Sequence, residues 1–135
     1  MAFQLNERLA AGGFDFGTNG ICRVLLKDNA AFPWLILVPE VDPDITELHQ
    51  LDASDYASVM FTIRQISEFV EKQFSPDKIN VAAIGNIVSQ LHIHIVARFA
   101  DDPAWPGVVW ASNAKESYSK ENALAIHEAY QLTFS

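Results

Sequence analysis

The chain has 135 residues, of which 50% are hydrophobic and 19% charged, and this composition predicts one domain spanning residues 1–135. Its net charge of -8 argues against nucleic acid as a partner, because phosphate backbones would be repelled. No apolar run is long enough to cross a membrane, the first residues lack a signal-peptide pattern, and the single cysteine, Cys22, excludes an internal disulfide. We therefore expect a cytoplasmic protein.

The first part of the chain predicts a short helix and then strands. Leu5–Ala10 is expected to be helical, and the glycine-rich stretch Gly17–Gly20 to form a turn. Ile21–Lys27 is rich in strand formers, and Asp28-Asn29 ends it. The nearly continuous apolar run Phe32–Pro39 predicts a strand that is buried on both faces.

The second part predicts one long helix, two strands and a terminal helix. Asp52 is a suitable N-cap for a helix that reaches Phe74, because apolar residues recur there at steps of three and four. Lys78–Ile84 and Gln90–Phe99 are expected to be strands, and Ser119 should cap a helix through about Gln131. Strands joined by short turns favour an α+β fold with an antiparallel sheet.

The most distinctive pattern of the chain lies in the second of these strands. Gln90, His92 and His94 alternate with apolar residues, so a strand would place them on one face. Side chains at i and i+2 are separated by ~6.5–7 Å along a strand. Two imidazoles at this spacing suit one phosphate group or one metal ion, although histidines with a purely structural role are the simpler alternative.

A metal site needs a third protein ligand besides the two histidines. No carboxylate follows within the strand, and Asp101 and Asp102 come only after its expected end. His49 and His127 lie in segments expected to be helical, without a recognisable motif. We therefore expect no metal and no other cofactor, and keep a two-histidine metal enzyme as the weaker alternative.

Nucleophilic catalysis at phosphorus is the third interpretation of the pair. A neutral imidazole nitrogen can attack a phosphate and divide hydrolysis into two easier displacements. Its other ring nitrogen must then be fixed by an acceptor. A neighbouring imidazole can bind a phosphate oxygen or pass a proton to the leaving group.

The segment Gly85–Val96 resembles the signature of the histidine triad (HIT) family, whose members are nucleotide hydrolases and transferases. Phe32–Pro39 looks like the central strand of that family, and residues 52–74 look like its long helix. Asp101–Trp110 is similar to the tail of a bacterial branch in which the first triad histidine is often glutamine. The resemblance implies a HIT-like antiparallel sheet of about five strands with one long helix and short terminal helices.

The same resemblance implies roles for four residues. His92 matches the nucleophile, His94 the histidine that contacts the phosphate and the leaving-group side, and Asn86 a phosphate-binding amide. Gln90 matches the first triad position and is included among the catalytic candidates. The implied activity is hydrolysis at the α-phosphate of a purine nucleotide, such as a phosphoramidate or a dinucleoside polyphosphate, through a nucleotidyl-histidine intermediate.

Two departures from the family pattern leave a second function open. Gln90 cannot ionise, and Ile87 stands where many members carry a hydroxyl residue. A nucleotide-binding or sensing module with little catalysis is therefore the alternative to a hydrolase. Arg98 shares the strand parity of His94, and a solvated arginine is its default interpretation.

The resemblance also places Leu26, Asp28 and Asn29 beside the nucleotide, where the two polar residues would bind the ribose. Their alternative role is that of ordinary turn residues. Trp105 and Trp110 lie in a loop expected to be irregular, where tryptophans often mark a substrate mouth or an interface. Because HIT proteins are commonly two-fold dimers, a homodimer is expected.

Overall fold

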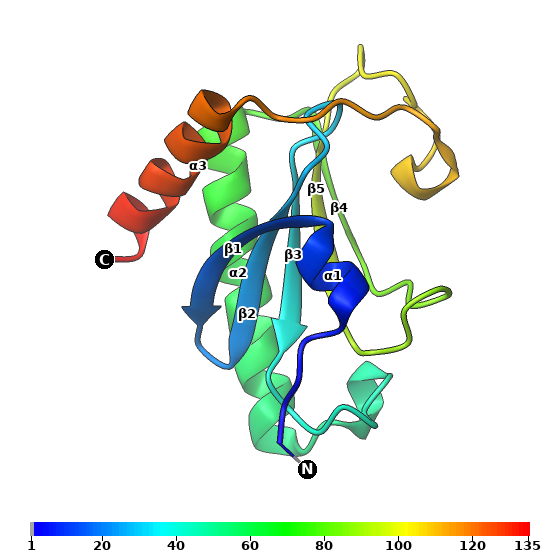
Figure 1. The fold of residues 1–135 in the computed structure, drawn as a ribbon, viewed down its shortest axis with the longest axis vertical. Helices are drawn as coiled ribbons and strands as arrows, with labels where there is room; N and C mark the ends of the chain where they lie inside the picture. The colour runs from blue at the N-terminus through cyan, green and yellow to red at the C-terminus, as the bar shows by residue number, and fades with distance from the viewer. Residues whose placement is uncertain (1) are drawn as a thin grey trace.

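A five-stranded antiparallel sheet forms the centre of the computed structural model, which describes residues 2–135 (Figure 1). The strand order is β1-β2-β3-β5-β4, and every neighbouring pair is antiparallel. The strands are β1 (Gly13–Asn19), β2 (Cys22–Lys27), β3 (Trp34–Pro39), β4 (Lys78–Ala82) and β5 (Ile93–Arg98). The predicted α+β class with about five strands is confirmed.

The helices lie on both sides of this sheet (Figure 1). The long helix α2 (Ala53–Phe74) and the C-terminal helix α3 (Lys120–Thr133) cover one face. The short helix α1 (Glu7–Ala11) and the 3-10 helix η2 (Val109–Ala111) lie over the other face, and a second 3-10 helix, η1 (Leu48–Gln50), precedes α2. The sheet is therefore covered on both faces, which matches the continuous apolar character of β3.

Local capping explains where the two main helices begin. The side chain of Asp52 accepts a hydrogen bond from the backbone N–H of Asp55 at the start of α2, as expected of an N-cap. Ser119 accepts from the N–H of Asn122 in the same way at the start of α3. Both predicted helix starts are confirmed, and α2 ends where a left-handed Ser75 follows it.

Strand alternation divides the apolar residues into two layers. One layer packs beneath α2 and α3, and its strand residues include Val24, Leu26, Leu35, Leu37, Ile93 and Ile95. The other layer faces α1 and η2, and its strand residues are Leu25, Trp34, Ile36, Val38 and Val96. Since Trp34 and Ile36 alternate with Leu35 and Leu37, β3 contributes to both layers and all six of its residues are buried.

Several strand boundaries differ from those predicted, most clearly those of β1 and β5. The expected turn at Gly17–Gly20 is mostly strand, because β1 continues to Asn19 through an irregularity between Asp15 and Thr18. The Asp15 carboxylate accepts the N–H of Gly17, which has φ +83, at a bulge in β1. The turn itself is made by Gly20 and Ile21, between the paired residues Asn19 and Cys22. In addition, β5 begins only at Ile93, and the preceding residues follow an irregular path.

Arg98 is buried, so the expected solvated arginine is wrong. Its side chain is 2% exposed and forms hydrogen bonds of 2.8 and 3.0 Å with the Asp102 carboxylate. A further bond of 2.9 Å joins it to Asn80 of β4. The rings of Phe32 and Trp105 each lie 5.7 Å from the guanidinium carbon. Arg98 therefore joins the sheet to the loop that follows β5.

Asp102 also holds the backbone of the loop that follows β5. Its carboxylate accepts the backbone N–H groups of Phe99, Ala104 and Trp105. The hydrogen bond from Arg98 is the main reason why the pKa of Asp102 is lowered to about 2. This ion pair fixes the segment that leads to Trp110 in η2.

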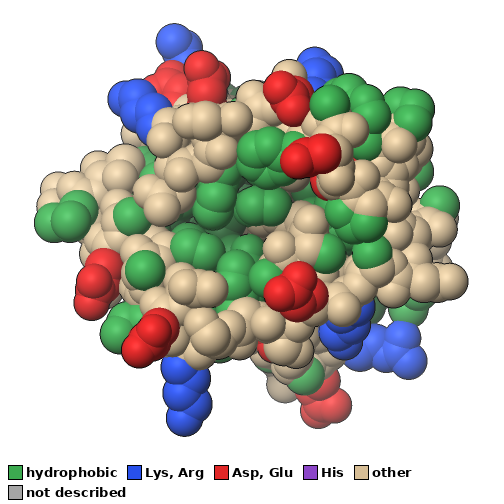
Figure 2. Space-filling view, turned by 90° about the horizontal axis from the view of Figure 1, so that it is seen from above, with side chains coloured by type: hydrophobic (Ala, Val, Ile, Leu, Met, Phe, Trp, Pro, Cys, Tyr) green, Lys and Arg blue, Asp and Glu red, His purple; other side chains and the backbone are tan. Residues whose placement is uncertain are grey.

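Figure 2 shows one end of the molecule, on which apolar side chains gather near the middle and most charged ones lie toward the periphery. No histidine is visible on this face. Among residues 2–135, none of the helices combines the length and the apolar character needed to span a bilayer.

Candidate active site

The two histidines lie together on the sheet face that α1 and η2 cover. Their ring centroids are 4.8 Å apart, with the ring planes at 70°. Both rings line a cavity of about 350 Å³ between α1, the ends of β2 and β5, residues 84–88 and η2. The polar and aromatic side chains of this cavity are Arg8, Lys27, Asn86, His92, His94 and Trp110. The predicted juxtaposition of the two imidazoles is thus present.

The hydrogen bond of His92 determines which of its nitrogens is free. Its Nδ1 lies 2.6 Å from the backbone carbonyl oxygen of Gln90. A carbonyl can only accept, so Nδ1 carries the proton and donates it. The neutral ring therefore keeps an unprotonated lone pair on Nε2, which is the form a nucleophile requires.

His94 has the opposite tautomer. The indole Nε1–H of Trp34 lies 2.9 Å from its Nδ1. Because an indole nitrogen can only donate, Nδ1 of His94 accepts, and a neutral ring carries its proton on Nε2. Burial lowers the pKa of His94 to about 3, with contributions from His92 and Lys27. His94 is therefore a neutral hydrogen-bond donor at physiological pH.

Replacing Trp34 with phenylalanine should release His94 from this tautomer. Without the indole donor, Nδ1 of His94 can carry a proton, so both neutral tautomers become accessible. We expect nitrogen-detected NMR to show a single tautomer protonated at Nε2 in the wild type and a mixture in Trp34→Phe. If Nε2–H donation assists the reaction, turnover should fall about tenfold.

Trp110→Phe is the matched control. The Trp110 ring lies 5.3 Å from the His94 ring, but its Nε1 has no hydrogen-bond partner among the described residues. This variant should therefore alter the packing beside His94 and preserve its tautomer. A wild-type tautomer ratio in Trp34→Phe would contradict the assignment.

Asn86 enters the cavity from the segment after β4. Gly85 before it has φ +64, in the left-handed region that favours glycine, so the chain turns here. Asn86 lines the same cavity as His92 and His94, so the structure brings these three predicted residues together. Ile87 lies at the rim and is 81% exposed.

Two cations in the cavity were not predicted. Lys27 projects from the end of β2, and its Nζ lies 5.0 Å from the centre of the Trp34 ring. Arg8 projects from α1. The described lining contains no carboxylate, although the whole chain carries a net charge of -8. The cavity is therefore locally suited to an anion.

The sequence matches the model of the HIT domain over residues 13–101. The chain belongs to the histidine triad (HIT) family. Among solved structures, a histidine triad protein from Marinobacter aquaeolei is 39% identical, with 98% of this chain and 96% of that chain covered and a TM-score of 0.93. One from Bradyrhizobium japonicum is 34% identical over the whole of both chains, with a TM-score of 0.95.

A third histidine triad protein, from Sinorhizobium meliloti, is 37% identical, with 97% of this chain and 96% of that chain covered and a TM-score of 0.92. A comparison with curated proteins finds no significant match. These likenesses extend over nearly the whole HIT chain, well beyond its histidine motif.

Gln90 of this HIT chain does not share the cavity with the histidines. The chain before Ile93 is not a regular strand, so the expected row of three side chains is limited to two. The Gln90 side chain instead accepts the N–H of Asn6 and donates to the carbonyl of Gln4, both at 2.9 Å. The structure therefore does not bring the Gln90 side chain together with the other catalytic candidates, although its backbone carbonyl contacts His92.

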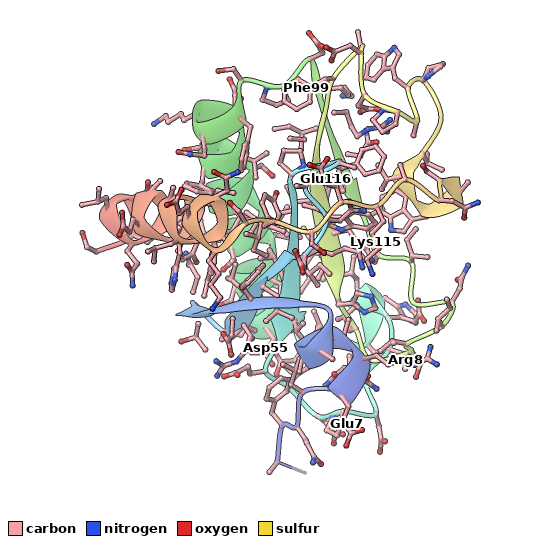
Figure 3. All side chains as sticks on the ribbon, turned by 45° about the horizontal axis from the view of Figure 1, so that its top comes forward. Glu7, Arg8, Asp55, Phe99, Lys115 and Glu116 are labelled. Carbon is pink, nitrogen blue, oxygen red and sulfur yellow. The ribbon has the colours of Figure 1, made fainter. Side chains whose placement is uncertain are left out.

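The three residues expected beside the nucleotide are not among those that line the histidine cavity. Leu26 is fully buried beneath α2, on the sheet face opposite the cavity. The Asp28 carboxylate accepts the N–H of Tyr118, and the Asn29 amide bonds to the backbone of residues 114 and 116. Their contacts correspond to the alternative role of turn residues, which here hold the segment that crosses the sheet between η2 and α3 (Figure 3).

The metal alternative finds no additional support among the described side chains of this chain. Among residues 2–135, no cluster of three or more histidine, cysteine or carboxylate side chains is placed to hold an ion. The hydrogen bonds of His92 and His94 occupy both Nδ1 atoms. Two Nε2 atoms alone fall short of the three protein ligands typical of catalytic zinc.

Proposed function

We propose that this HIT protein hydrolyses purine nucleotide derivatives at the α-phosphate. The observation that carries the proposal is the opposite tautomers of the two imidazoles in one cavity. His92 offers a lone pair on Nε2, and His94 offers an N–H donor. Members of the HIT family are nucleotide-binding hydrolases, which agrees with this chemistry.

The proposed reaction has two displacements. Nε2 of His92 attacks the α-phosphorus, and the bond from phosphorus to the leaving group breaks with its electron pair on the leaving atom. Water then attacks the phosphorus of the nucleotidyl-histidine, and the P–N bond breaks with its electron pair returning to Nε2 of His92. One proton of the water passes to solvent, and the nucleoside monophosphate leaves. The Gln90 carbonyl retains its hydrogen bond from Nδ1–H throughout and stabilises positive charge on the substituted ring.

His94 and Asn86 act on the phosphate in this proposal. The Nε2–H of His94 donates a hydrogen bond to a phosphate oxygen or to the departing atom. Burial lowers the pKa of His94, so its ring stays neutral while it donates. Asn86 supplies an amide donor from the lining of the same cavity. No metal or cofactor takes part.

The cellular context is also a proposal. A groove of about 480 Å³ along the outer edge strand β4 is lined by the exposed apolar side chains of Val81, Trp105 and Val108. Edge strands with exposed apolar residues favour pairing with another chain, so we propose a homodimer. The single free thiol, Cys22, favours a reducing cytoplasmic location.

The test is a product assay combined with calorimetry on the purified protein. A hydrolase should release adenosine monophosphate from an adenosine phosphoramidate or a dinucleoside polyphosphate, with equal rates in the presence of chelator. Micromolar binding without turnover would instead identify the nucleotide-sensing module, which the position of Gln90 and the lack of a hydroxyl at Ile87 favour. Loss of activity in chelator would identify a metal enzyme.

A further inference from the structure

Gln90 ties the N-terminal segment to the chain just before β5. Both ends of its amide are used by backbone groups, the N–H of Asn6 and the carbonyl of Gln4. Asn6 is also the N-cap of α1, because its side chain accepts the N–H of Arg8 at 2.8 Å. Gln90 therefore fixes the point at which α1 begins.

The position of α1 brings two side chains to the cavity. Leu9 is 8% exposed and packs in the same apolar layer as Trp34. Arg8 extends from α1 toward the segment after β4, whereas Glu7 leaves the helix in another direction (Figure 3). Among residues 2–135, the guanidinium of Arg8 forms no hydrogen bond and no ion pair.

A free guanidinium at the rim of a carboxylate-free cavity suits a second phosphate group. Arginine binds phosphate oxygens through paired N–H donors. Arg8 reaches the cavity from α1, while the reacting imidazoles reach it from β5. A phosphate bound by Arg8 is therefore a neighbour of the α-phosphate in the phosphate chain of the nucleotide, for example the one that departs with the leaving group.

We infer that the docked N-terminal segment is part of the substrate site and that Arg8 binds a phosphate beyond the α-phosphate. This inference rests on the proposed function and assigns it a substrate class, nucleotides whose leaving group is itself a phosphate. The bond that breaks is then a P–O bond of a phosphoanhydride, and its electron pair stays on the oxygen of the departing phosphate. Gln90 is a positioning residue for Arg8.

The experiment compares two adenosine substrates that share the α-phosphate. Diadenosine triphosphate releases adenosine diphosphate, whose departing phosphate is anionic. An adenosine phosphoramidate of an uncharged amine releases that amine, which carries no phosphate. Arg8→Ala should lower kcat/KM for the first about tenfold or more and for the second by less than about twofold. Arg64→Ala, which removes an exposed arginine of α2, should change neither value. Equal losses on both substrates, or no loss on either, would overturn the inference.

The role of Gln90 is tested by a double-mutant cycle. Gln90→Leu should show the same substrate-selective loss as Arg8→Ala, and the double variant should lose no more than either single variant. Amide exchange at Asn6 should become faster in Gln90→Leu, because its acceptor is removed. Additive losses in the double variant would show that Gln90 does not act through Arg8.

Calorimetry separates this inference from the proposed function. If the wild type hydrolyses neither substrate, the proposed function fails, and binding decides the inference. Arg8→Ala should then weaken adenosine triphosphate about tenfold and leave adenosine monophosphate unchanged. Equal effects on the two nucleotides would contradict it, as would a wild type that binds neither.

Discussion

Replacing His92 with alanine should lower kcat by roughly four orders of magnitude, as expected when a covalent nucleophile is removed. The proposed route passes through a bond between Nε2 of His92 and phosphorus, and no other described group in the cavity presents an imidazole lone pair. His94 cannot substitute, because Trp34 holds it in the tautomer that is protonated on Nε2. The rate is measured by release of adenosine monophosphate.

The same variant should still bind nucleotide. His92 is 6% exposed and contributes one ring to a cavity that keeps its cations and Asn86. We therefore expect calorimetric affinity for adenosine monophosphate to change by less than about tenfold, since one neutral hydrogen bond is lost. His127→Ala is the control, because that ring stacks on Phe16 outside the cavity. Undiminished hydrolysis in His92→Ala would rule out the assigned nucleophile.

Breaking the buried ion pair of Arg98 should destabilise the fold by about 3–5 kcal/mol, because one charge is left buried without its partner. In Arg98→Met the Asp102 carboxylate, whose side chain is 4% exposed, loses its only cationic partner among the described residues. The free energy of unfolding is measured by urea denaturation at pH 7. The double variant Arg98→Met, Asp102→Asn leaves no unpaired buried charge, so it should recover part of the lost stability.

The pair of Arg64 and Glu68 provides the control at the same spacing of four residues. These side chains are 77% and 62% exposed, and their closest charged atoms are 3.7 Å apart. Removing this exposed pair should cost less than about 1 kcal/mol. Equal losses for the two pairs would contradict the structural role assigned to Arg98.

The pH dependence of stability gives an independent check. The folded-state pKa of Asp102 is about 2, below its ordinary value of 3.8, so the unfolded chain binds this proton more readily. The stability that Asp102 contributes is therefore complete above about pH 4–5 and is lost as the pH falls toward 2. Between pH 7 and pH 3 the wild type should lose more stability than Asp102→Asn, and parallel curves would contradict this assignment.

Local signals were sufficient to predict the scaffold. The long helix follows from the Asp52 cap and the apolar positions at steps of three and four, and both are seen in α2. The continuous apolar run of β3 follows from burial on both sheet faces. Strand parity alone also brought His92 and His94 to one face, because His92 lies directly before β5 and keeps its direction.

Contacts between distant segments limited the prediction of the site. The alternation of polar and apolar residues predicts a strand that begins at Gln90. Hydrogen bonds to the backbone of Gln4 and Asn6, more than 80 residues away in sequence, instead hold the Gln90 side chain outside the cavity. Arg8 depends on the same docking, so no local pattern could place it in the cavity. Lys27 did carry a signal, since its parity with Leu25 sets it on the face opposite Leu26.

Trapping the covalent intermediate tests the central claim most directly. The protein is mixed with a dinucleoside polyphosphate, quenched in base within the first turnover, digested and analysed by tandem mass spectrometry. We predict a nucleotidyl group on His92 in the wild type and none in His92→Ala. The fraction of protein that carries this group should be larger when hydrolysis of the intermediate is slow. Turnover with the nucleotidyl group on another residue, or direct attack of water without any adduct, would contradict the account.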